Sequence, residues 1–195
     1  MEIVLIVFCF FIFCFVFWRE LKEDYIPSQI FSTALTIGFL FLVAYTLTSY
    51  FLKQYRFWFL VFSVILGYII GSKRTGLKYY EGYDNMVLGA LISLVASAVI
   101  LIKHWGIDWI LFYASVVLSL SVFVLIKKNY KAFIWYKSGK RGFSGLFTVG
   151  VFFLIRSIIS FAKPDFVLSL TEYDMFISGL ISFASFLNIF ILANK

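Results

Sequence analysis

The sequence predicts an all-α, polytopic membrane protein: one bundle of seven transmembrane helices with the N-terminus outside and the C-terminus in the cytoplasm. Three observations lead to this prediction. The chain is 63% hydrophobic and only 14% charged, whereas a soluble domain is about 45–50% apolar and about 25% charged. Its apolar runs have the length that crosses a bilayer. Its Lys and Arg residues are unevenly divided between the two sets of loops. We expect residues 1–195 to form a single transmembrane domain.

Charge clusters separate seven apolar runs along the chain. A membrane-spanning helix needs about 20 mainly apolar residues, so 195 residues leave room for six or seven spans and for no sizeable soluble domain. The third run is the shortest, which leaves a re-entrant segment open as an alternative. The runs cover residues 3–18, 30–52, 57–71, 86–102, 109–126, 143–162 and 175–193.

The distribution of cations predicts the orientation. Lys and Arg in short loops are retained on the cytoplasmic side of a membrane. Of the 17 cations, 12 lie in the loops after the first, third and fifth runs or at the end of the chain. Another 4 lie in the loops on the opposite side, and Arg156 lies within the sixth run. This bias puts the N-terminus outside, and it favours seven spans over six.

Several classes of function have no support in the sequence. The net charge of +7 could attract nucleic acid, but the cations lie in loops between spans and not on a soluble module, so we expect no nucleic-acid partner. Cys9 and Cys14 lie within the first apolar run and lack metal-ligand spacing. A nucleotide-binding loop, a zinc motif and a serine elbow are all missing. We therefore expect no cofactor and no metal.

Arg156 is the most informative single residue. It stands deep in an apolar run, where a charge costs at least about 2.5 kcal/mol, so intramembrane ionisable residues are usually functional. One interpretation is an anion site that holds a lipid phosphate, because a guanidinium binds phosphate in a bidentate manner. The alternative is a structural arginine that reaches the membrane surface or pairs with a carboxylate of another span.

The remaining polar residues are weaker signals. Asp84, before the fourth run, and Asp174, before the seventh, are interpreted as groups that cap the start of their own helices. Trp58 lies near the end of an apolar run, as expected of an aromatic anchor at the membrane surface. His104 is the only histidine and a weak candidate for a general base.

From the sixth run onward the sequence resembles a family of membrane enzymes. Residues 142–147, Gly-Phe-Ser-Gly-Leu-Phe, precede Arg156 in a pattern similar to the glycine-led penultimate helix of the prolipoprotein diacylglyceryl transferases and its functional arginine. Lys163-Pro-Asp and Leu170-Thr resemble the turn and the helix start that follow, and Tyr113 lies in the corresponding order upstream. These bacterial inner-membrane enzymes move diacylglycerol from phosphatidylglycerol to a lipobox cysteine. The resemblance implies that Arg156 binds the lipid headgroup, with Tyr113 and Lys163 as secondary site residues.

Two signatures of this family are missing. No histidine occurs in residues 57–67, where the family has His-Gly-Gly, and Leu94 stands where the family signature has an arginine. Two functions therefore stay open. The first is a minimal diacylglyceryl transferase, with phosphatidylglycerol and a prolipoprotein signal peptide as partners. The second is a non-catalytic membrane protein that binds phosphatidylglycerol or another anionic phospholipid, or assists assembly, on the same fold.

Overall fold

In the computed structural model, residues 2–51, 55–101, 106–133, 136, 141–163 and 173–193 are described. All regular structure within these residues is helical, and each of the seven apolar runs overlaps one α-helix. A short 3-10 helix, η3 (Tyr130–Ala132), follows the fifth α-helix. The α-helices are α1 (Glu2–Leu21), α2 (Pro27–Tyr50), α3 (Arg56–Thr75), α4 (Tyr79–Leu101), α5 (Ile107–Asn129), α6 (Phe143–Ala162) and α7 (Asp174–Ala193).

Six of these helices are long enough and apolar enough to cross a membrane: α1, α2, α3, α5, α6 and α7. This is the pattern of a multi-pass membrane protein. The third apolar run belongs to a continuous helix of 20 residues, so its short apolar stretch does not reflect a short helix. The first two turns of α4 carry Glu81, Asp84 and Asn85. A crossing by α4, and with it the count of seven spans, stays a prediction.

The helices extend beyond the apolar runs at their charged ends. α3 continues to Thr75 through Lys73 and Arg74, and α4 begins at Tyr79, seven residues before the expected start at Met86. Hydropathy marks the residues that lipid surrounds, whereas a helix ends where its backbone hydrogen bonds end. The polar turns can therefore be helical and still lie at the membrane surface.

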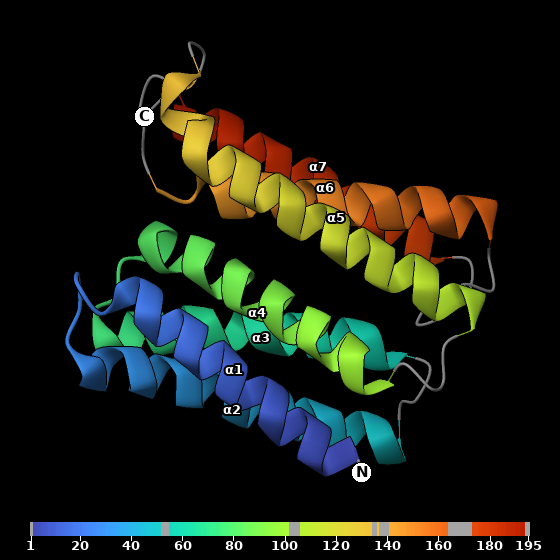
Figure 1. Cartoon of the computed structure of the whole chain (residues 1–195), viewed down its shortest axis with the longest axis horizontal. Helices are drawn as coiled ribbons and strands as arrows, with labels where there is room; N and C mark the ends of the chain where they lie inside the picture. Colours follow the sequence, from blue (N-terminus) through green and yellow to red (C-terminus); the bar gives the residue numbers. More distant parts are fainter. Residues whose placement is uncertain are drawn as a thin grey trace.

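The bundle has two layers, with α5–α7 in one and α1–α4 in the other (Figure 1). α4 joins them, because it packs against α1 in its own layer and against α5 and α6 in the other. The most extensive helix–helix contacts are those within the hairpins α2–α3 and α6–α7. In the first hairpin, a Cβ atom on Gly67 would lie 2.8 Å from the Cα atom of Ile37. Small residues of this kind allow helix backbones to approach closely in a membrane.

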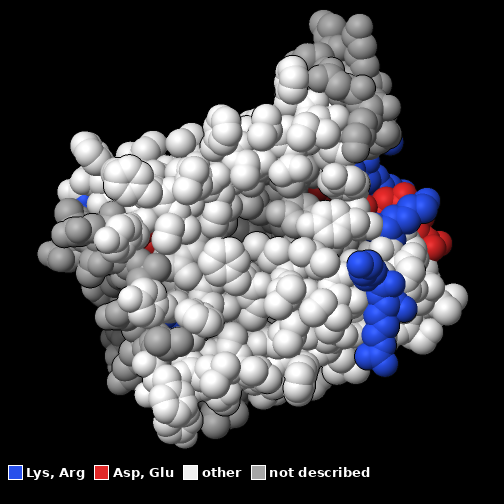
Figure 2. Space-filling view, turned by 180° about the vertical axis from the view of Figure 1, so that it is seen from behind, with Lys and Arg blue, Asp and Glu red and all other residues white. Residues whose placement is uncertain are grey.

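The outer surface matches the apolar composition. Phe39 on α2 and Phe183 on α7 are 66% and 67% exposed, whereas Phe17 and Phe123 are fully buried. Figure 2 shows a broad lateral face without charged side chains, with Lys, Arg, Asp and Glu gathered mainly at one end. α1 begins and α7 ends at opposite ends of the bundle (Figure 1). Which end faces the cytoplasm stays a prediction from the cation count.

Candidate functional site

Arg156 is buried where three helices converge. It lies six residues before the end of α6, about 9 Å along the helix axis, and only 2% of its side chain is exposed. Its Nη2 atom lies 2.9 Å from Oδ1 of Asp174, the first residue of α7, whose side chain is fully buried. The guanidinium therefore pairs with a carboxylate of the neighbouring helix, as in the structural alternative that the sequence left open.

Two further side chains hold the carboxylate of Asp174. The indole Nε1 of Trp58 in α3 donates a hydrogen bond of 2.9 Å to Oδ1. The hydroxyl of Ser160 in α6 donates one of 2.7 Å to Oδ2. Buried charges are tolerated when they are both paired and hydrogen-bonded. Asp174 meets both conditions through groups on two neighbouring helices.

Aromatic rings of α3 cover the guanidinium. The Cζ atom of Arg156 lies 3.9 Å from the centre of the Phe57 ring and 5.7 Å from that of Trp58. A desolvated cation over an aromatic face gains about 2 kcal/mol or more. The consecutive residues Phe57 and Trp58 thus stabilise both members of the ion pair, the first by stacking on the cation and the second by a hydrogen bond to the anion. The resulting cluster ties the start of α3 to the α6–α7 hairpin.

This geometry assigns Arg156 a structural role that needs no ligand. A lipid phosphate that approached the guanidinium would have to compete with the carboxylate of Asp174. Two cavities bordered by described residues lie elsewhere: one is lined by α1, α4 and α5, and the other by α2 and Arg74 of α3. Binding of a headgroup by Arg156 itself stays a prediction.

Comparisons with family models, curated proteins and solved structures found no match for this chain. Its resemblance to the diacylglyceryl transferases stays a prediction carried by residues 142–178. Among the described residues, no group of three or more His, Cys, Asp or Glu side chains could hold a metal ion.

The secondary site residues, Tyr113 and Lys163, have contacts of their own. The hydroxyl of Tyr113 in α5 is 3.1 Å from that of Ser97 in α4. The Tyr113 ring packs against Phe112, which in turn contacts the Phe57 ring. Lys163, directly after α6, forms an ion pair with Asp108 in the first turn of α5. These contacts link neighbouring helices.

His104, the candidate general base, lies outside the described residues, as does Thr171 of the predicted helix start. Leu94, which replaces the family arginine, is half-buried against the core in α4. The structure therefore gives Leu94 a packing role.

Sequence reasoning missed the roles of Trp58 and Asp174. Trp58 is not a surface anchor, because it is 3% exposed and bonded to Asp174. Asp174 lies in the first turn of α7, as expected, but its side chain binds groups of α3 and α6. One signal could have revealed the pair: in a hairpin, a position shortly before the end of one helix lies level with the start of the next. Arg156 and Asp174 have this relationship.

Sequence reasoning also assigned the wrong role to Asp84. It lies inside α4 and does not cap that helix; its carboxylate accepts the backbone N–H of Gly142 at 2.8 Å and that of Gly145, at the start of α6. Gly142 has φ of +103°, a conformation that favours glycine. A carboxylate at this position also interacts favourably with the helix dipole. Asp84 therefore positions the start of α6 from a different helix.

Ion pairs and hydrogen bonds connect the elements at this same end of the bundle. Tyr25, between α1 and α2, donates a hydrogen bond of 2.7 Å to the Glu81 carboxylate of α4. Burial raises the pKa of Tyr25, and the hydrogen bond to Glu81 raises it further. Arg141, just before α6, pairs with Asp24. The N-terminal hairpin is thus joined to both α4 and α6 through polar groups.

Proposed function

We propose that this chain is a multi-pass membrane protein that binds anionic phospholipid without transferring diacylglycerol from it. The observation that carries the non-catalytic part of the proposal is the buried pair of Arg156 and Asp174, 2.9 Å apart. The arginine that the family resemblance assigns to the lipid headgroup is engaged by a carboxylate of its own chain. We place this function in the bacterial inner membrane, with seven spans and the C-terminus in the cytoplasm.

The chemistry of transfer supports the non-catalytic side of the proposal. A cysteine thiol must lose its proton before its sulfur can attack the lipid. Asp174 is the carboxylate that contacts Arg156, and its oxygens already accept hydrogen bonds from Trp58, Ser160 and Arg156 itself. Leu94 offers no charge to a phosphate. The side chains at this site are arranged to hold helices together.

The distribution of charge supports the lipid-binding side. Arg19, Lys127 and Lys128 lie at the end of the bundle where the cation count predicts the cytoplasm. Cations close to a membrane surface attract anionic lipids by about 1 kcal/mol each. Val124 and Leu125, in the preceding turn of α5, are exposed apolar side chains. An anionic phospholipid has the matching combination of a charged head and apolar chains.

Diacylglyceryl transfer to a prolipoprotein signal peptide is the second candidate. The observation that favours it is the similarity of residues 142–178, in which the glycine-led start and the intramembrane arginine fall in the order of the family motif. Catalysis would require a proton acceptor beside the thiol, and His104 is the candidate that the sequence offers. The two functions differ in one product, a thioether on the acceptor cysteine.

The test is an incubation of the purified full chain with phosphatidylglycerol and a lipobox peptide, followed by mass spectrometry of the peptide and of the lipids retained by the protein. An active transferase serves as the positive control. We expect no thioether product and more retained phosphatidylglycerol than phosphatidylcholine. A thioether product would establish the enzyme, and equal retention of the two lipids would remove the binding function.

A further inference from the structure

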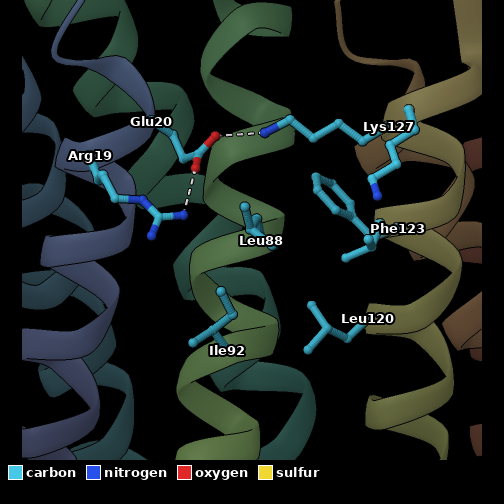
Figure 3. A pocket seen from close by; sticks show the side chains of 9 residues that line it. Arg19, Glu20, Leu88, Ile92, Leu120, Phe123 and Lys127 are labelled. Atoms are coloured by element: carbon cyan, nitrogen blue, oxygen red, sulfur yellow. Dashed lines mark hydrogen bonds and ion pairs between the residues drawn. The ribbon is translucent and has the colours of Figure 1, made fainter.

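A groove between α1 and α5 has the form of a lipid site. α4 packs against both helices and forms the floor, where Leu88 and Ile92 point into the groove (Figure 3). Leu120 and Phe123 of α5 line one wall. The cavity has a volume of about 350 Å³, within the range of about 300–1,000 Å³ typical of ligand pockets.

The mouth of the groove is charged. Arg19 and Glu20 of α1 face Lys127 and Lys128 of α5 across it. Glu20 bridges the two walls, because one of its carboxylate oxygens lies 3.0 Å from Arg19 and the other 2.6 Å from Lys127 (Figure 3). Three cations and one carboxylate leave a net charge of +2. The groove thus has a cationic mouth and an apolar interior, and α5 lines both of them.

We propose that this groove binds one anionic phospholipid, with the phosphate at Arg19 and Lys127 and an acyl chain along Ile92 and Leu120. The site rests on the lipid-binding function proposed above and gives it a location away from Arg156. The distance from Lys127 to Leu120 along α5 is about 10 Å, so one acyl chain can follow the wall from the headgroup region into the membrane.

Charge and position select this occupant. The mouth is formed by the last turns of α1 and α5, and the ends of membrane-spanning helices lie near the lipid headgroups. The groove interior is lined by aliphatic and aromatic side chains, which suit an acyl chain and offer nothing to a free phosphate. Glu20 now holds the two cations that a phosphate would bind. A lipid phosphate therefore competes with Glu20 for Arg19 and Lys127.

This competition predicts opposite effects for two kinds of substitution. Each cation near a membrane surface contributes about a fivefold change in the affinity for anionic lipid. The pair Lys127→Gln and Lys128→Gln should weaken retention of phosphatidylglycerol by about 25-fold. Glu20→Gln, which removes the competitor and adds one net positive charge, should strengthen retention by about fivefold. A general loss of folding cannot produce the second result.

The measurement is native mass spectrometry of the full chain released from vesicles of phosphatidylglycerol and phosphatidylcholine. Lys73→Gln with Lys131→Gln is the matched control, because it removes two exposed cations at the same end but outside the groove. Ile92→Trp should also lower retention, since the larger side chain fills the floor. Circular dichroism confirms that each variant keeps its helices.

Four results would overturn the assignment. Equal losses in the Lys127/Lys128 and Lys73/Lys131 variants would indicate a diffuse surface effect. Unchanged retention in every groove variant would place the lipid elsewhere while leaving the lipid-binding function intact, whereas a wild-type chain that retains no phosphatidylglycerol would remove both. A dimer that Ile92→Trp dissociates would show that a second copy of the chain fills the groove.

Discussion

The guanidinium of Arg156 in α6 lies 3.9 Å from the centre of the Phe57 ring in α3, although 98 residues separate them in the sequence. The same guanidinium pairs with Asp174 of α7. A cation, an anion and an aromatic face from three helices therefore form one buried unit. Substitutions can test how much this unit stabilises the bundle and how much of that stability comes from the ion pair.

Arg156→Met should destabilise the bundle by about 3–5 kcal/mol, because it leaves the Asp174 carboxylate buried without its charge partner. Asp174→Leu should do the same for the guanidinium. The double variant should lose much less than the sum of the two, since no charge is left unpaired. Unfolding midpoints in a mild detergent measure all three. Additive losses would show that the pair contributes no coupling energy.

Asp84→Ala should destabilise the start of α6 by about 2 kcal/mol, because the N–H groups of Gly142 and Gly145 lose their common acceptor. Asp84→Asn keeps one acceptor oxygen and should cost less. Hydrogen exchange of the peptide that contains residues 142–150 measures the effect locally. Glu23→Gln, an exposed change at the same end, is the control; faster exchange in this variant would contradict a specific role for Asp84.

Gly67→Ala should destabilise the α2–α3 hairpin by about 1–3 kcal/mol, since the new methyl group would meet the backbone of Ile37 at 2.8 Å. Gly179→Ala is the matched control in α7. Its Cβ would lie 3.6 Å from the Ser157 hydroxyl, an ordinary contact, and alanine favours a helix over glycine by about 1 kcal/mol. We expect this variant to be neutral or more stable in thermal unfolding. Equal losses at both positions would exclude close packing as the cause.

The orientation can be measured with cysteine labelling in intact cells. In a chain whose Cys9 and Cys14 are replaced by alanine, Tyr55→Cys should react with a membrane-impermeant maleimide. Lys131→Cys should react only after the membrane is opened. The two positions lie at opposite ends of the bundle, before α3 and after α5, and the cation bias puts Lys131 inside. The reverse pattern would invert the topology, and labelling of both in intact cells would contradict the model of seven spans.

The number of helices and their approximate places followed from composition and hydropathy, because the cost of exposing polar groups to lipid acts on each segment separately. The exact ends of the helices did not follow from composition and hydropathy. α4 begins in a polar turn that hydropathy assigned to a loop, since surface turns keep their backbone hydrogen bonds whatever their polarity.

The site was predicted only in part. Arg156 was identified because a buried charge in an apolar run is costly wherever the chain folds. The partners of Arg156 were not identified, because in the sequence Trp58 and Asp174 look like the aromatic anchors and capping residues that are common at helix ends. Likewise, the carboxylate of Asp84 was assigned to its own helix, although it binds the start of α6.

The sequence by itself determined that this chain belongs in a membrane as a helical bundle, and that one arginine within it needs compensation. Tertiary structure alone decided which groups supply it: Asp174, Trp58 and Phe57 reach Arg156 only when α3 packs beside the α6–α7 hairpin. The physical reason is the range of each effect. Transfer into lipid depends on the composition of one segment, whereas ion pairs and hydrogen bonds depend on distances of about 3 Å between segments far apart in the chain.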